Sequence, residues 1–156
     1  MPIPAYMKME GIPGSSIVEG RENTVEVLKF DHEVHIPTDR KDGSASGTRV
    51  HGRFTITKNY DKSSPELFKY LCNGKDVPEV TLSWYHIEAS GDEVVYYTHT
   101  LRNCKVVKVK SLMPDVDKPE NEQFKHREEV SFQYEEITWR FEEGNIEYTD
   151  SWLKGR

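Results

Sequence analysis

The chain has few of the features that mark membrane, disulfide-rich or leader-bearing sequences. Its two cysteines, Cys72 and Cys104, are too few for a disulfide framework and lack the paired spacing of a zinc site, so we expect buried or semi-buried thiols. No stretch approaches the roughly 20 apolar residues of a membrane helix. The segment from Met1 to Gly11 holds two prolines and no apolar signal-peptide core. These absences favour a cytoplasmic protein that does not insert into a membrane and has no cleaved signal peptide.

A concentration of positive charge is also missing. Lys and Arg number 21 against 27 Asp and Glu, which gives a net charge of -6 and a pI near 5.5. Binding to nucleic acid requires a basic face, so no nucleic-acid partner is expected. The mean hydropathy is -0.76, and the 35% hydrophobic and 11% aromatic residues suit a sheet protein with a thin core and a wet surface. A length of 156 residues predicts one domain over residues 1–156.

The sequence lacks a catalytic or metal-binding constellation. His32 and His35 lie three apart on a predicted strand, so their side chains point to opposite faces and do not form a metalloprotease motif. The segment 43–47 is not a nucleophile elbow, because its central residue is Ala. The loop that begins at Asp115 departs from a calcium loop at its fifth, sixth and twelfth positions. We therefore expect no enzyme activity, no metal and no cofactor.

Alternation of apolar and polar residues predicts that most of the chain forms strands. The buried face changes between Val27 and Leu28 and again at Glu135-Glu136, as it does where a bulge or bend interrupts a strand. We expect a mainly β fold, a compact barrel of two packed, strongly coiled antiparallel sheets. The predicted strands cover residues 5–10, 24–36, 50–58, 79–87, 93–101, 103–110, 124–141 and 146–148.

One short α-helix is predicted to flank the sheets, from Pro65 to Cys72. Ser63 or Ser64 would cap its start, and Asn73-Gly74 would end it in a left-handed turn. The apolar stripe of this helix is predicted to consist of Leu67, Phe68, Leu71 and Cys72. A helix of about two turns is not stable alone in water, so it must pack on the sheet.

The segment from Thr38 to Thr48, which we call the arm, joins two predicted strands. It contains two glycines, four charges and almost nothing apolar. A hairpin needs only about two to five residues to turn, and longer loops in compact domains are usually functional or disordered. The arm is therefore a protruding loop. Its composition alone favours an ordinary surface loop, and the alternative is a segment that reaches a neighbouring subunit.

Sequence motifs along the whole chain resemble the hemolysin-coregulated protein family, Hcp, the tube subunit of type VI secretion systems. The most specific segments, in order, are F-D-H-x-V-x-I-P-x-D from Phe30, G-x-x-x-G-x-R-V-H from Gly43, and F-x-I-T-K from Phe54. Further similarity lies in the opening strand, in L-S-W-Y from Leu82, at Met113-Pro114 and in the strand that ends I-T-W.

The resemblance implies a structural subunit. Hcp proteins form hexameric rings, which stack head to tail into a tube that carries effector proteins in its bore. A tip spike protein and a contractile sheath are the implied partners, and the subunit would leave the bacterial cytoplasm without a cleaved signal peptide. No toxin domain is added after this domain, so a plain tube subunit is expected.

On this resemblance the arm would contact an adjacent subunit or ring. Gly43, Gly47, Arg49 and His51 would then matter more for assembly than for folding of the monomer. The full set of expected interface residues is Asp39, Asp42, Gly43, Ser44, Ser46, Gly47, Arg49 and His51.

A second function, from a different class, is a monomeric β-barrel that binds a small ligand or peptide. Several aromatic residues could line its pocket, namely Tyr6, Tyr60, Trp84, Tyr96 and Tyr97.

Overall fold

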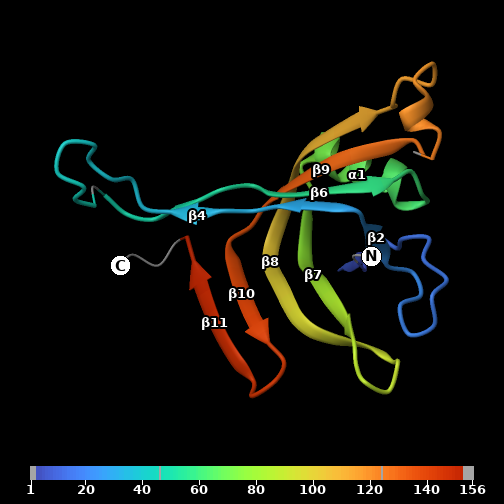
Figure 1. Ribbon diagram of the computed structural model, residues 1–156. Coiled ribbons are helices and arrows are strands. Elements are labelled where there is room, and N and C mark those ends of the chain that lie inside the picture. The colour runs from blue at the N-terminus through green and yellow to red at the C-terminus, as the bar shows by residue number, and fades with distance from the viewer. Residues whose placement is uncertain (1–2, 46, 124, 153–156) are drawn as a thin grey trace.

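The computed structural model describes residues 3–45, 47–123 and 125–152. Strands make up about half of this part of the chain, with one α-helix and one short 3-10 helix (Figure 1). The helices are α1 (Ser63–Asn73) and η1 (Pro119–Asn121). The strands are β1 (Ala5–Met9), β2 (Val25–Val27), β3 (Lys29–Asp31), β4 (Val34–His35), β5 (Val50–His51), β6 (Phe54–Asn59), β7 (Asp76–Ile87), β8 (Glu93–Leu112), β9 (Arg127–Gln133), β10 (Glu136–Phe141) and β11 (Ile146–Ser151).

Nine strands form one antiparallel sheet, and β4 and β5 form a second, two-stranded sheet. The large sheet has the order β2-β1-β7-β8-β9-β6-β3, and the β10–β11 hairpin is attached to β8. Its end strands β2 and β3 are separated in the chain by Leu28 alone, whose amide donates to the Thr57 carbonyl of β6 at 2.8 Å. The sheet therefore curls until its two ends meet. The predicted mainly β fold with two sheets and one α-helix is confirmed. The strands are divided unequally, with nine in one sheet and two in the other.

Strand β8 is the longest strand and holds the sheet together. Its residues 97–102 pair with β10 and its residues 105–112 pair with β9, while β7 occupies the opposite edge. The prediction of two strands, 93–101 and 103–110, is wrong, because Asn103 adopts a φ of 52° inside a continuous strand. The predicted strand 124–141 is instead two strands, which separate at Tyr134 and Glu135, one residue before the predicted change of buried face at Glu135-Glu136. The beginning of that prediction, Phe124, lies outside the described residues.

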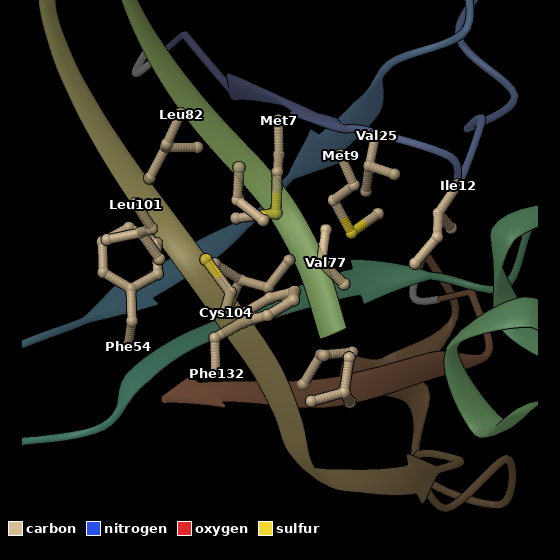
Figure 2. Close-up of a cluster of buried hydrophobic side chains, with 14 of the residues drawn as sticks. Met7, Met9, Ile12, Val25, Phe54, Val77, Leu82, Leu101, Cys104 and Phe132 are labelled. Carbon is tan, nitrogen blue, oxygen red and sulfur yellow. The ribbon is translucent and has the colours of Figure 1, made fainter. Parts of the chain in front are cut away.

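The core lies inside the curl and is made by side chains that face each other across neighbouring strands (Figure 2). One row crosses four strands, because Met9 pairs with Val80, Val80 with Leu101, and Leu101 with Ile137. All four of these side chains are buried. Burial of each such side chain contributes about 1.5–3 kcal/mol, so this row supplies much of the stability that holds the strands in register.

Helix α1 packs on β8 and buries Leu67 and Tyr70. Gly74 ends it with a φ of 61°, which confirms the predicted left-handed stop. The predicted start is wrong, because Ser63 and Ser64 lie within the first turn and Asp61 accepts the hydrogen bond from the Ser63 amide. The predicted apolar stripe is also partly wrong: Phe68 and Cys72 are exposed, whereas Cys104 is buried as expected.

The predicted strand 24–36 is divided into β2, β3 and β4. The break at Leu28 confirms the expected change of buried face. Val34 and Ile36 were expected to continue the core face, but they are 38% and 50% exposed. The reason is that β4 has already left the large sheet and pairs only with β5.

Candidate functional site

The arm protrudes from the body of the molecule beyond the β4–β5 ribbon (Figure 1). Its described residues are exposed, with the ribbon at its base. The tip is closed by a bridge between Thr38 and Ala45 and by a hydrogen bond from the Asp39 amide to the Ser44 carbonyl at 2.7 Å. The arm is thus a folded projection with its own turn.

Side chains of the arm stabilise this turn locally. The Asp39 carboxylate accepts from the Lys41 amide at 2.8 Å, and the Asp42 carboxylate accepts from the Ser44 amide at 2.9 Å. Short acidic side chains commonly bond to backbone amides two residues on in this way. Gly43 and Gly47 have φ values of 73° and 89°, a region that glycine enters without steric cost. Among the predicted interface residues, Ser46 lies outside the described residues.

A group of four residues, Arg49, His51, Tyr134 and Asp150, joins the base of the arm to the body, and we call it the anchor. The Arg49 guanidinium donates Nε to Asp150 Oδ2 at 2.5 Å and Nη2 to Oδ1 at 2.8 Å. The same Nη2 donates to the Ser151 carbonyl at 2.9 Å. A two-point bond between guanidinium and carboxylate fixes orientation as well as distance. The arm is thereby attached to the last strand, β11.

His51 and Tyr134 are the two buried side chains of the anchor. Nε2 of His51 lies 2.7 Å from Asp150 Oδ2, and Nδ1 of His51 lies 2.6 Å from the Tyr134 hydroxyl. The carboxylate of Asp150 only accepts, so Nε2 of His51 donates to it. The Tyr134 hydroxyl also lies 2.8 Å from Nε2 of His32. A continuous chain of hydrogen bonds therefore links His32, Tyr134, His51 and Asp150.

Burial and charge tune the protonation of these groups. The hydrogen bond from Arg49 lowers the pKa of Asp150, which keeps it ionised. Burial lowers the pKa of His32 from 6.5 to about 4, with a further contribution from the nearby His51. Burial raises the pKa of the Tyr134 hydroxyl. At neutral pH the His32 ring and the Tyr134 hydroxyl are therefore uncharged, and Asp150 carries the negative charge that faces Arg49.

Aromatic rings cover the anchor. Trp152 stacks on His51 with ring centroids 5.5 Å apart, and it meets Tyr134 edge-on at 6.2 Å. On the other side His32 packs against Phe54 and Trp139, at 5.4 and 6.3 Å. These rings help to bury the His51 and Tyr134 side chains, and burial strengthens the hydrogen bonds that these two residues make.

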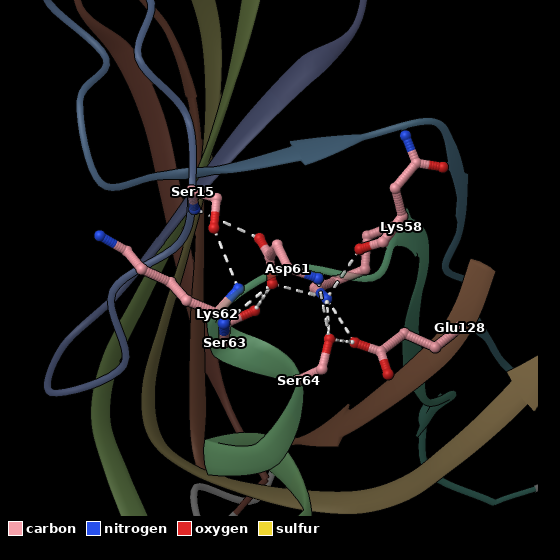
Figure 3. Close-up of polar contacts among 8 residues, drawn as sticks. Ser15, Lys58, Asp61, Lys62, Ser63, Ser64 and Glu128 are labelled. Carbon is pink, nitrogen blue, oxygen red and sulfur yellow. Dashed lines mark hydrogen bonds and ion pairs between the residues drawn. The ribbon is translucent and has the colours of Figure 1, made fainter. Parts of the chain in front are cut away.

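A second polar cluster lies where β6 meets the start of α1 (Figure 3). The Lys58 ammonium forms ion pairs with Glu128 of β9 and with Asp61, the latter at 3.0 Å. The Ser64 hydroxyl donates to Glu128 at 2.7 Å. Both Lys58 and Glu128 are fully buried, so this cluster fixes the helix to the sheet.

The structure holds two of the predicted interface residues, Arg49 and His51, against the body of the same chain. Asp39, Asp42, Gly43 and Ser44 lie together at the tip. Sequence reasoning missed Tyr134 and Asp150, which are 83 and 99 residues from His51. No local pattern marks such distant partners.

The five aromatic residues considered for a ligand pocket do not converge. Tyr6 packs edge-on against Tyr85, and Tyr96 stacks on His86. Trp84 packs against Phe30 and contributes to a cavity of about 410 Å³ that none of the other four lines. A single shared pocket is therefore not formed by these side chains.

The two histidines of the predicted strand separate as expected. His32 contacts Tyr134 of the anchor, while His35 is exposed and lies 3.2 Å from Glu33. Within residues 3–45, 47–123 and 125–152, no cluster of three or more His, Cys, Asp or Glu side chains could hold a metal ion. No helix in this part of the chain is both long and apolar enough to span a membrane.

The fold is that of the secreted proteins of type VI secretion systems. Hcp1 from the E. coli EAEC 042 pathovar is 38% identical in sequence and superimposes with a TM-score of 0.85, covering 98% of this chain and 99% of that one. Secreted protein Hcp3 from Pseudomonas aeruginosa is 32% identical, with a TM-score of 0.76 over 97% of this chain and 99% of that one.

Sequence comparison agrees with this fold. The family model described as "Type VI secretion system effector, Hcp" matches residues 6–141. The "Major exported protein" of Pseudomonas aeruginosa strain PAO1 is 36% identical over 97% of this chain and 96% of its own length. The chain belongs to the Hcp family. Members of this family are structural or secreted tube proteins and not enzymes, and both descriptions point to secretion.

Proposed function

We propose that this chain is the tube subunit of a type VI secretion system, with residues 1–156 acting as one tube-subunit domain. Six copies close into a ring, rings stack into a tube, and the bore carries effector proteins. The observation that carries this proposal is the arm, a folded projection whose base is fixed to the body and whose tip contributes nothing to the core of its own chain.

Exposed apolar side chains and open sheet edges support the proposal. On the β10–β11 hairpin Phe141 pairs with Ile146, and Trp139 stacks on Tyr148. Ile146 and Tyr148 are 68% and 65% exposed. Contiguous exposed apolar residues usually mark contact surfaces, and strand edges left open in one chain can be covered by another copy. A head-to-tail contact between copies closes a ring when its rotation divides a full turn.

The other partners follow from the family. The tip spike protein and the contractile sheath would act on the assembled tube. The subunit would reside in the bacterial cytoplasm before firing and would then be secreted without a cleaved signal peptide.

Native mass spectrometry and electron microscopy test the proposal directly. A sixfold mass and annular or tubular particles are the expected result, and a strictly single-chain mass at high concentration would refute it in favour of a monomeric ligand carrier. Deletion of residues 44–47 is expected to abolish stacked tubes while circular dichroism and thermal unfolding of the monomer stay close to those of the parent. Unchanged hexamers and tubes after this deletion would show that the arm is not the assembly contact.

A further inference from the structure

One carboxylate connects the arm to the last strand. Asp150 of β11 accepts from both Arg49 and His51, which lie two residues apart where the arm returns to the body. The Asp150 side chain is only 11% exposed, and the His51 side chain only 2%. The contact is thus a buried, charged joint between two segments about 100 residues apart.

The geometry of this joint fixes the orientation of the arm relative to the body. A single hydrogen bond would leave the returning strand free to swivel, whereas here one carboxylate binds two residues of that strand and is met by both prongs of the Arg49 guanidinium. Tyr134 holds the His51 ring from its other nitrogen. The Arg49 bond to the Ser151 carbonyl adds a second point along β11. By contrast, the hydrogen bonds that the Asp39 and Asp42 carboxylates accept at the tip come from Lys41 and Ser44 of the arm itself.

We propose that Asp150 is the positioning residue of the arm, and that it sets the angle at which the arm leaves the body and meets a second copy of the chain. This inference rests on the proposed function, because it assumes that the arm is the contact between copies. It assigns to a residue of β11, far from the arm in sequence, control over the geometry of that contact.

Spin-label distance measurement tests the positioning. Labels at Lys41→Cys in the arm and Lys69→Cys on the outer side of α1 report the direction of the arm, in a Cys72→Ser background. Cys104 stays because burial raises the pKa of its thiol to about 12, which keeps it unreactive. Labelled chains are diluted into excess unlabelled chains so that the measured distances are intramolecular. The parent is expected to give one narrow distance distribution.

Asp150→Asn removes the charge at almost constant shape and is expected to broaden the distribution at least twofold. Glu147→Gln is the matched control, because it makes the same change on the same strand, where Glu147 pairs with Arg140 rather than with the arm. The control is expected to keep the narrow distribution. The thermal unfolding midpoint of each variant is measured alongside, since a merely structural role of Asp150 would lower the midpoint without broadening the distance distribution.

Arg49→Lys provides a second test of the positioning if Asp150→Asn folds poorly. It keeps the positive charge but lacks the two-pronged donor, so an intermediate broadening is expected. Narrow distributions in both variants would overturn the inference, whatever happens to assembly. Broadening with loss of stacked tubes supports it. Broadening with unchanged rings and tubes also supports the positioning, and would instead refute the role of the arm in the proposed function.

Discussion

The buried ion pair between Lys58 and Glu128 gives the sharpest test of how this fold is stabilised. The Lys58 side chain is 0% exposed and that of Glu128 is 1% exposed. The ammonium also lies 3.0 Å from Asp61 and donates to the Ser64 hydroxyl at 3.2 Å and the Asn59 carbonyl at 3.1 Å. One cation therefore neutralises two carboxylates at the junction of β6, β9 and α1.

This two-to-one arrangement makes the two single substitutions unequal. Lys58→Met leaves both Glu128 and Asp61 without a cation, and removing one partner of a buried pair costs about 3–5 kcal/mol of unfolding free energy. Glu128→Gln leaves Lys58 paired with Asp61 and still able to bond to the amide, so the expected cost is only about 1–3 kcal/mol. In the double variant, Lys58→Met should cost less unfolding free energy than it does alone, because Glu128→Gln has already removed the carboxylate that would be left unpaired.

Urea unfolding at neutral pH, followed by circular dichroism at a concentration where the chain is monomeric, measures these free energies. Lys62→Met is the matched control, since the same substitution at a neighbouring exposed lysine removes only a contact with Asn23 and should change stability by about 0.5 kcal/mol or less. A cost below about 1 kcal/mol for Lys58→Met, or a larger cost for Glu128→Gln than for Lys58→Met, would refute this account of the cluster.

Two further predictions concern protonation and thiol chemistry. Burial lowers the pKa values of His32 and His99 from 6.5 to about 4, so the unfolded chain binds these protons first and stability should fall as pH drops from about 6.5 towards 4. At pH 5 the expected loss relative to pH 7 is roughly 1–2 kcal/mol for each histidine, measured by urea unfolding; equal or greater stability at pH 5 would contradict the burial of both rings. Cys72 is exposed and Cys104 is buried, with the pKa of the Cys104 thiol raised to about 12, so a thiol reagent should modify Cys72 in the native monomer and Cys104 only after unfolding. Mass spectrometry of the modified peptides checks this, and early modification of Cys104 would show that the core opens readily.

Features that depend on a few neighbouring residues could be predicted from the sequence. Asn73-Gly74 marked the end of the helix, because glycine adopts the left-handed conformation that a helix stop requires. The break at Leu28 and the one at Tyr134 and Glu135 were visible as a change in which residues of the alternation are apolar. The arm was visible as a segment with nothing to bury.

Features that depend on strand order could not be predicted in this way. Residues 93–101 and 103–110 were predicted as two separate strands, but pairing with β7 on one side and with β9 and β10 on the other keeps β8 continuous. Val34 and Ile36 carried the right alternation for a core strand, yet the chain leaves the large sheet after β3, before it reaches them. Phe68 and Cys72 were assigned to the buried stripe because helical spacing alone does not say which face meets the sheet.

The sequence by itself determined that this chain is rich in strands, acidic and equipped with a polar arm, because alternation, charge and turn chemistry are local properties. Only the tertiary structure decided that Lys58 is a buried cation and that Arg49 and His51 are bound by Asp150. The physical reason is that a hydrogen-bond partner is chosen by which strands the folded sheet places side by side, and residues about 100 positions apart carry no local trace of that choice.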